Sequence, residues 1–426
     1  MDDLSTTREL AAYIDASPSP FHAVAEVAER LDAAGYAELD PAAAWDELPD
    51  AGYIRRGGAI IAWSAPPDAP ATTPFVLVGA HTDSPNLRIK ARPDVGSVGW
   101  RQVGVEVYGG VLLNSWLDRD LGISGRVVLR DGDSTETRLL LVDRPLLRVA
   151  QLAIHLDRGA NDGLKLDKQR HLTPIWGVGS VEQGDFATFV AHELGVSQDE
   201  ILAWDLMTHD VTPSSLLGRD DELLAAPRID NLCSVYCATD ALLRSDERDP
   251  SSVRVFVAFD HEEVGSATST GAGGPELRRI LERLATARGG TRDDFHRAMS
   301  ASYVVSADGA HATHPNWPER HEPSHHVAVN AGPVVKINAN QRYASDAETI
   351  ARFELACERA GVPVQRYVHR NDLPCGSTIG PITAANLGVP VVDVGVAQLS
   401  MHSAREMIGA HDPELMVSAL AELLAT

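Results

Sequence analysis

The stretch PFVLVGAHTDSP, residues 74–85, decides the fold of this chain. Its first seven residues are apolar at nearly every position, and polar residues begin abruptly at His81. Such a run is typical of a strand that is buried on both faces, as in a parallel sheet covered by helices. The same pattern recurs in VRVFVAF (253–259), SYVVSA (302–307) and VPVVDVGVA (389–397).

Segments with helical periodicity accompany these runs. Residues 277–284 and 415–424 are two of them, and a third has Leu232, Val235, Tyr236, Thr239, Leu242 and Leu243 on one face. Residues 6–39 also predict helix, interrupted at SPSPFHAV (17–24), where two prolines favour an extended turn. Together the patterns predict an α/β fold in which a mixed, largely parallel sheet is flanked by helices.

The segment 91–225 has a different character. GVEVYGGVLLN (104–114) alternates, and GRVVLRDGDSTETRLLLVD predicts a hairpin around Asp131-Gly132-Asp133. Helical periodicity is scarce there, which favours small antiparallel sheets. We therefore predict an α/β domain of residues 1–90 plus 226–426, interrupted by a β-rich inserted domain at 91–225.

The composition of the 426-residue chain excludes several classes of protein. Its formal net charge of −23 opposes binding to nucleic acid, which requires a basic surface. No apolar stretch reaches the roughly 18 residues that span a bilayer, and the polar start MDDLSTTREL does not resemble a signal peptide. Free thiols in a reducing cytosol are the expectation for Cys233, Cys237, Cys357 and Cys375. We expect a cytoplasmic protein, with neither nucleic acid nor membrane as a partner.

Ionisable side chains follow the four predicted strands at the points where the strands end. They are His81 and Asp83, then His261, Glu262 and Glu263, then Asp308, and finally His402, with Asp230 at the start of the helix that contains Leu232. In open α/β sheets, ligands bind at the carboxyl ends of the strands. Imidazole and carboxylate suit zinc and its divalent neighbours. Two histidines, two aspartates and one glutamate suffice for two ions when one carboxylate bridges them.

Each of these residues also has an ordinary interpretation. Asp230 can be a helix N-cap, Asp308 can cap a turn, and Glu262 with Glu263 can be a solvated pair. A lone histidine after a strand is commonly a hydrogen-bonded or surface residue. Their shared position at strand ends favours the joint interpretation as a metal centre.

The motifs resemble the aspartyl aminopeptidase family of metallopeptidases along essentially the whole chain. The matching segments are SPSPFHAV, GAHTDSPNLRIK, WLDRDL, LAIHLDRG, PRIDNLCS, FDHEEVGS, SADGAHATHPN, GPVVKINANQRYASD and SMHSAREM. The resemblance implies a metallo-aminopeptidase-like fold with two divalent metal ions, zinc being the first choice and cobalt or manganese the alternatives. It assigns His81, Asp308 and a bridging Asp230 to one ion, and Glu263, His402 and the same Asp230 to the other.

The same resemblance implies roles in catalysis. Glu262 would be the general base that takes a proton from a metal-bridging water, and Asp83 would hydrogen-bond the imidazole of His81. The substrates would be peptides with a free N-terminus, preferentially Asp or Glu. Lys336 would supply the cation for that side chain, with Tyr343 beside it. The alternative for Lys336 is a solvated strand lysine.

The resemblance also implies an assembly. The inserted domain would mediate dimerisation, and six dimers would form a homododecamer in which His155 reaches a neighbouring active site to bind substrate. An ordinary helix histidine is the alternative for His155. Two other groups have no predicted ligand role: Asp118 with Asp120, and the cluster of His311, His314, His321, His325 and His326, some of which the family likeness makes assembly or substrate-channel contacts.

Other hydrolase signatures are absent from the sequence, including a G-x-S-x-G elbow, a P-loop and an H-E-x-x-H helix. Three alternatives stay open: an aminopeptidase of broader specificity, another amide hydrolase with the same centre, such as a deacylase or carboxypeptidase, and a non-catalytic assembly or binding protein that retains the fold. Loss of activity on acetylated substrates separates an aminopeptidase from the other hydrolases. The complete set of ligands with an adjacent base argues against a non-catalytic protein.

Overall fold

The computed structural model describes residues 4–45, 47–245 and 251–425. Its larger part is built on a sheet of nine described strands, and the four predicted strands lie next to one another at its centre, all parallel. In order across the sheet the strands are β1 (Ala37–Glu38), β2 (Ala51–Arg56), β3 (Ala59–Ser64), β13 (Val253–Phe259), β4 (Phe75–His81), β14 (Tyr303–Ala307), β18 (Val391–Gly395), β16 (Val334–Ile337) and β17 (Gln365–Val368). The predicted mixed, largely parallel α/β fold is confirmed.

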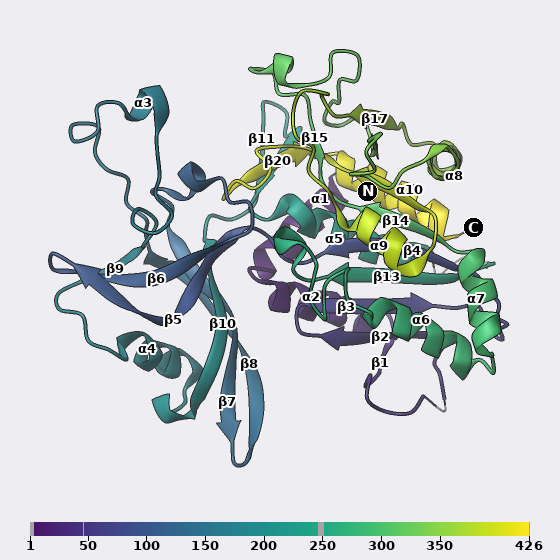
Figure 1. The fold of residues 1–426 in the computed structure, drawn as a ribbon, viewed down its shortest axis with the longest axis horizontal. Coiled ribbons are helices and arrows are strands. Elements are labelled where there is room, and N and C mark those ends of the chain that lie inside the picture. The colour runs from purple at the N-terminus through teal and green to yellow at the C-terminus, as the bar shows by residue number, and fades with distance from the viewer. Residues whose placement is uncertain (1–3, 46, 246–250, 426) are drawn as a thin grey trace.

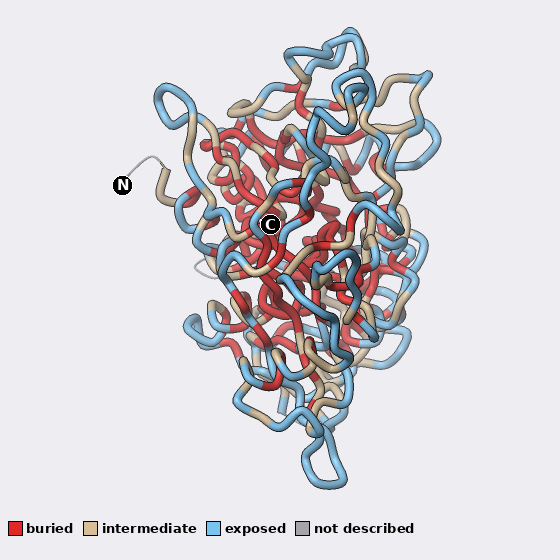
Figure 2. Tube along the Cα trace, turned by 90° about the vertical axis from the view of Figure 1, so that its left-hand side faces the viewer, coloured by how far each residue is buried: buried red, intermediate tan, exposed pale blue. Residues whose placement is uncertain are grey.

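Helices cover both faces of this sheet (Figure 1). One face packs against α1 (Ser5–Ala16), α2 (Pro20–Ala33), α5 (Ile229–Ser245), α8 (Ala347–Ala360) and α10 (Asp412–Leu424). The other packs against α6 (Glu276–Ala287), α7 (Arg292–Ser300) and α9 (Ile379–Leu387). The central strands are therefore buried on both sides, which explains their continuous apolar sequence. Figure 2 shows this buried interior enclosed by exposed loops. No helix in the described ranges combines the length and apolarity needed to cross a membrane.

The predicted break in the first helical segment occurs at residues 17–19, between α1 and α2. Ser19 is the N-cap of α2: its side chain accepts the main-chain N–H of His22, and Pro20 occupies the first helical position, where no N–H is needed.

A second sheet extends to the left of the first in Figure 1 and is antiparallel throughout. Its described strands, in order, are β8 (Ser134–Leu147), β7 (Leu121–Asp131), β10 (Ile201–Asp210), β5 (Asn86–Ser97), β6 (Trp100–Tyr108) and β9 (Ile175–Val178). The predicted hairpin is confirmed, because Asp131 pairs with Ser134 across a two-residue turn. A core of its own packs against α4 (Asp185–Leu194), and α3 (Ala160–Gly163) is a single turn.

A third, smaller sheet lies beside the end of the nine-stranded sheet and was not predicted. Its described strands are β11 (Ser215–Leu217), β12 (Leu223–Ala226), β20 (Glu406–Gly409), β19 (Ala397–Leu399) and β15 (Ala310–His311). It joins the end of the predicted insertion to the C-terminal part of the chain. The boundaries at residues 91 and 225 stay a prediction about how the chain divides into domains.

Candidate metal centre

The ends of parallel strands bring the predicted residues to one edge of the nine-stranded sheet. His81 is the last residue of β4 and lies level with the end of β13. Glu262 and Glu263 follow β13 in a short 3-10 turn, and Asp308 follows β14 directly. His402 comes from the turn between β19 and β20. The structure therefore gathers side chains that are far apart in sequence.

Asp230 lies between the two histidines. Its Oδ1 atom is 3.3 Å from Nε2 of His81, and its Oδ2 atom is 3.5 Å from Nε2 of His402. Although α5 starts at Ile229, Asp230 has non-helical backbone angles (φ −80°, ψ 104°), and the residue is only 4% exposed. The two oxygens of one carboxylate thus face two different sets of side chains.

Each histidine has a second carboxylate beside the same nitrogen. Nε2 of His81 is 3.5 Å from Oδ1 of Asp308, and Nε2 of His402 is 3.3 Å from Oε1 of Glu263. Ligand atoms of His81, Asp230 and Glu263 lie within 4.8 Å of one another, so the two sets form one cluster.

The donor atoms of this cluster fit a divalent cation. Oδ1 of Asp230 and Oε1 of Glu263 are buried, and neither accepts a hydrogen bond of good geometry from the part of the chain described here. A buried carboxylate oxygen without a donor is costly unless a cation compensates it. Imidazole nitrogen and carboxylate oxygen are the ligands that zinc accepts.

Main-chain carbonyls orient both imidazole rings. Nδ1 of His81 lies 3.0 Å from the carbonyl oxygen of Asp83, and Nδ1 of His402 lies 3.0 Å from that of Gly110. Because a carbonyl only accepts, Nδ1 carries the proton in each ring and Nε2 faces the carboxylates. Asp83 therefore contacts His81 as the sequence predicts, but its carbonyl makes the shorter contact and its carboxylate is 3.4 Å away.

The electrostatics of the cluster favour positive charge. Burial lowers the pKa of His402, but the adjacent carboxylates of Asp230 and Glu263 outweigh it and raise the pKa to about 12. Burial is likewise outweighed at His81, where Asp230, Asp308 and Asp83 raise the pKa well above its ordinary value. Burial raises the pKa of Asp230, yet the adjacent imidazoles of His402 and His81 hold it below its usual range. The carboxylates thus create the negative potential that a divalent cation requires.

Glu262 differs from Asp230, Glu263 and Asp308 because none of the ion pairs described with His81, His402 or Lys336 includes its carboxylate. It is half-buried at the wall of the cavity described below. Burial raises its pKa to about 8, and the nearby carboxylates of Asp308, Glu263 and Asp230 add to the rise while His81 opposes it. A carboxylate with a pKa near neutrality is suited to accept and return a proton.

Asp83 fixes the main chain of that glutamate pair. Its Oδ1 accepts the N–H of Glu262 at 3.0 Å, and its Oδ2 accepts the N–H of Glu263 at 3.1 Å and the hydroxyl of Tyr108 at 2.7 Å. Burial raises the pKa of Asp83, but His81 and these donors lower it below its usual range. The carboxylate therefore serves the loop that contains Glu262, a role that sequence analysis did not foresee.

A cavity of about 260 Å³ opens in front of the cluster. Its lining residues are His81, Asp230, Glu262, Asp308, Gly309, His311, Lys336, Tyr343, Gly376, Ser377, Thr378, Met401 and His402. Lys336, only 2% exposed, donates to the carbonyls of Asp308 and Gly309 at 3.2 and 3.1 Å, and its Nζ lies 3.6 Å from Oδ2 of Asp308. The ring centroid of Tyr343 is 5.1 Å from the same Nζ. Lys336 is therefore not a solvated strand lysine.

Other predicted residues lie away from the cluster. His155 is exposed in a turn between β8 and β9, so its interpretation as a helix histidine is wrong, and it does not line the cavity. Asp118 and Asp120 are paired with Arg148, at 3.7 and 2.8 Å. Of the histidine cluster, His311 lines the cavity and the other four residues do not.

Two glycines that were not predicted as site residues follow β6 and bring this part of the antiparallel sheet against the cluster. A Cβ atom at Gly110 would lie 2.9 Å from Nδ1 of His402, and one at Gly109, where φ is 74°, would lie 3.0 Å from Cβ of Glu263. The main chain can approach both side chains only because these residues lack a Cβ. The paired glycines in VYGGV were the available signal. Residues 376–378 also line the cavity, but their sequence gave no signal, because a short polar loop has no periodicity.

Comparison with known proteins gives consistent matches over nearly the whole chain. Residues 13–423 match the family model described as aminopeptidase I zinc metalloprotease (M18). The probable M18 family aminopeptidase 2 of Streptomyces coelicolor is 54% identical over 426 residues, which is 99% of this chain and 98% of that protein. The protein of the same description from Mycobacterium tuberculosis is 54% identical over 427 residues, with the same two coverages.

Solved structures of similar proteins also match nearly the whole chain. Ape4 in its complex with Nbr1 has a TM-score of 0.96 and 35% identity, covering 99% of this chain and 86% of that one. The mApe1 dodecamer of Saccharomyces cerevisiae has a TM-score of 0.86 and 27% identity, covering 99% of this chain and 97% of that one.

Proposed function

The chain belongs to the aminopeptidase I zinc metalloprotease (M18) family, and from that premise we propose that it removes single N-terminal residues, preferentially Asp or Glu, from peptides at a centre of two metal ions. The resemblance seen in the sequence is thereby confirmed at the level of the family. The number of ions, the acidic preference and the role of each residue are the parts that we propose.

The position of Asp230 is the observation that carries the two-ion proposal. Its Oδ1 faces His81 and its Oδ2 faces His402, at 3.3 and 3.5 Å. We assign His81, Asp308 and Asp230 to one ion and His402, Glu263 and Asp230 to the other, with zinc as the metal. The orphaned oxygens of Asp230 and Glu263 support this assignment.

When bound, metal ions held by these residues would lower the pKa of a coordinated water and polarise the scissile carbonyl. Glu262 takes the proton from the attacking water and returns it to the leaving amine, for which its raised pKa of about 8 is suited. Asp83 keeps Glu262 in place by holding its main-chain N–H, while the carbonyls of Asp83 and Gly110 hold the two imidazole rings.

Lys336 is the cation that we assign to the side chain of an acidic substrate. Two of its three ammonium hydrogens are used by the carbonyls of Asp308 and Gly309. We assign the third to a substrate carboxylate in the cavity, beside the ring of Tyr343, where Oδ2 of Asp308 also lies 3.6 Å from Nζ. A buried, preoriented ammonium selects for a carboxylate more strongly than a mobile surface lysine does.

We also propose that the chain assembles in the cytoplasm as a homododecamer built from six dimers, with the predicted insertion at the dimer interface. The relation to a dodecameric mApe1 supports the assembly. His155 then binds substrate in a neighbouring subunit, and its exposed turn, which lies outside the cavity of its own chain, fits that role.

A panel of aminoacyl chromophore substrates tests the function. After chelation, zinc, cobalt or manganese is restored separately, and each substrate is assayed with a free and with an acetylated N-terminus. We expect the highest kcat/KM on Asp and Glu, and loss of activity on acetylation. Equal rates on Leu and Ala would establish broader specificity, and hydrolysis of acetylated substrates would point to another amide hydrolase.

A further inference from the structure

A second buried glutamate holds the main chain of two residues in the cluster. Oε2 of Glu406 accepts the main-chain N–H of Asp230 at 2.8 Å, and Oε1 accepts that of His402 at 2.6 Å. Glu406 is the first residue of β20 and is 2% exposed. One carboxylate therefore ties the start of α5 to the turn between β19 and β20.

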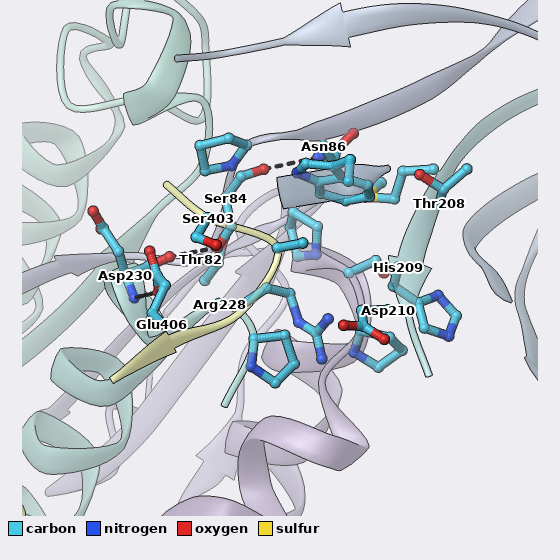
Figure 3. Close-up of a pocket in the computed structure, with 18 residues that line it drawn as sticks. Thr82, Ser84, Asn86, Thr208, His209, Asp210, Arg228, Asp230, Ser403 and Glu406 are labelled. Carbon is cyan, nitrogen blue, oxygen red and sulfur yellow. Dashed lines mark hydrogen bonds between the residues drawn. The ribbon is translucent and has the colours of Figure 1, made fainter. Parts of the chain in front are cut away.

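Glu406 lies behind the cluster and does not line the catalytic cavity. It faces a separate polar pocket between the two larger sheets, where Figure 3 shows Glu406 beside Asp230 with the hydrogen bond drawn as a dashed line. The hydroxyl of Ser84 donates to the carbonyl of Asp230 at 2.6 Å, so both main-chain groups of Asp230 are fixed. Glu406 is thus placed to act on the cluster and not on the substrate.

The backbone of His402 needs such support. Its φ of 65° lies in the left-handed region, which a residue with a Cβ adopts reluctantly. The hydrogen bond from its N–H to Glu406 stabilises that conformation, and the conformation aims Nε2 at Asp230 and Glu263. Without this hydrogen bond, the turn can relax and move the imidazole of His402 away from Asp230 and Glu263.

We propose that Glu406 is a positioning residue for both metal ions, through the main chains of Asp230 and His402. This inference rests on the proposed two-ion centre. Asp230 faces both sets of ligands, so loss of the hydrogen bond that anchors its main chain lowers the binding affinity for both ions. Loss of a single ligand mainly lowers the affinity for one ion. Partners of this kind typically contribute roughly 10–100-fold in metal affinity or activity.

Glu406→Gln tests the inference, because an amide retains one acceptor and turns a donor toward the other N–H. Asp412 provides the matched control: it is 1% exposed, and its carboxylate accepts the N–H of Asn330 at 2.7 Å and of Gly332 at 3.1 Å, away from the cluster. Zinc affinity and stoichiometry are measured by competition with a chromogenic chelator in wild type, Glu406→Gln and Asp412→Asn. Thermal unfolding of the metal-depleted proteins is recorded alongside.

Both variants should lose stability, but only Glu406→Gln should lose affinity for both ions, by roughly 10–100-fold. At saturating zinc its kcat should fall while KM stays unchanged, because Glu406 does not line the cavity. Unchanged affinity, or an equal loss in Asp412→Asn, would overturn the inference. Should Glu406→Gln fail to fold, Glu406→Asp replaces it: the shorter carboxylate reaches one N–H and should give a smaller loss. Fewer than two zinc ions in wild type would instead refute the proposed centre.

Discussion

The main-chain N–H of Glu262 donates to the carboxylate of Asp83 at 3.0 Å, and Asp83 is two residues beyond His81. The proposed base and a proposed ligand are therefore held in register by one side chain. These hydrogen bonds link the residues after β4 to the residues after β13, although the two segments are far apart in the sequence.

Glu262→Gln should lower turnover by ~10²–10⁴-fold and leave the metal content nearly intact, because Glu262 is proposed as a proton carrier and not as a ligand. The measurements are steady-state kinetics and elemental analysis of the same preparation. A variant that loses one ion but retains its turnover per bound metal would refute the assignment.

Asp230→Ala should lower the occupancy of both metal sites, because its two oxygens face different ligand sets. His81→Ala and His402→Ala should each lower mainly one. Elemental analysis after exposure to limiting zinc compares the three variants. Full occupancy of both sites in the Asp230 variant would rule out the bridge.

Lys336→Met should depress kcat/KM on Asp and Glu substrates far more than on Leu or Ala substrates. Methionine retains most of the apolar length and removes the charge, and a desolvated charge pair that loses one partner costs roughly 2–5 kcal/mol. A smaller loss on every substrate is expected too, since Lys336 also holds the carbonyls of Asp308 and Gly309. Equal losses on all substrates would mean that the acidic preference has another source.

Tyr108→Phe should lower kcat, since it removes the hydroxyl that donates to Asp83 at 2.7 Å and loosens the loop of Glu262. A hydrogen bond to a charged group contributes about 1.5–3 kcal/mol. Tyr53→Phe is the matched control, because that buried tyrosine donates to Asp32 at 2.8 Å, away from the cluster. Both variants should unfold at lower temperature, and a kcat equally reduced in Tyr53→Phe would contradict the prediction.

Mixing two inactive variants tests catalysis across subunits. A dimer with one His155→Ala and one Glu262→Gln subunit contains one site with both native groups if His155 serves its neighbour. Co-expressed mixtures should therefore regain activity that neither homogeneous variant shows. Light scattering first establishes that His155→Ala assembles. No recovery in verified mixed oligomers would refute the shared site and leave the metal centre unaffected.

Local patterns predicted the parts of the fold that depend on local physics. Strands buried on both faces have continuous apolar sequence, and the hairpin at Asp131 and the break before Pro20 depend on turn residues. The third sheet gave no such signal, because strands of two to four residues, such as β15 and β20, are too short for a periodicity.

Some residues of the candidate site could be predicted from local sequence, and others could not. Residues at strand ends, such as His81 and Asp308, could be predicted as members of one site because a parallel sheet places its strand ends together. Hydrogen bonds between distant segments could not. Glu406 resembles any other strand glutamate in the sequence, and only the folded chain brings its carboxylate between the N–H groups of Asp230 and His402.

The contacts of residues 108–112 make the cluster dependent on the junction between the two larger sheets. This segment supplies the hydroxyl of Tyr108 to Asp83, the carbonyl of Gly110 to the ring of His402, and the N–H of Leu112 to the carbonyl of His402 at 3.0 Å. The cluster therefore has all three of these contacts only when the antiparallel sheet is docked on the larger one.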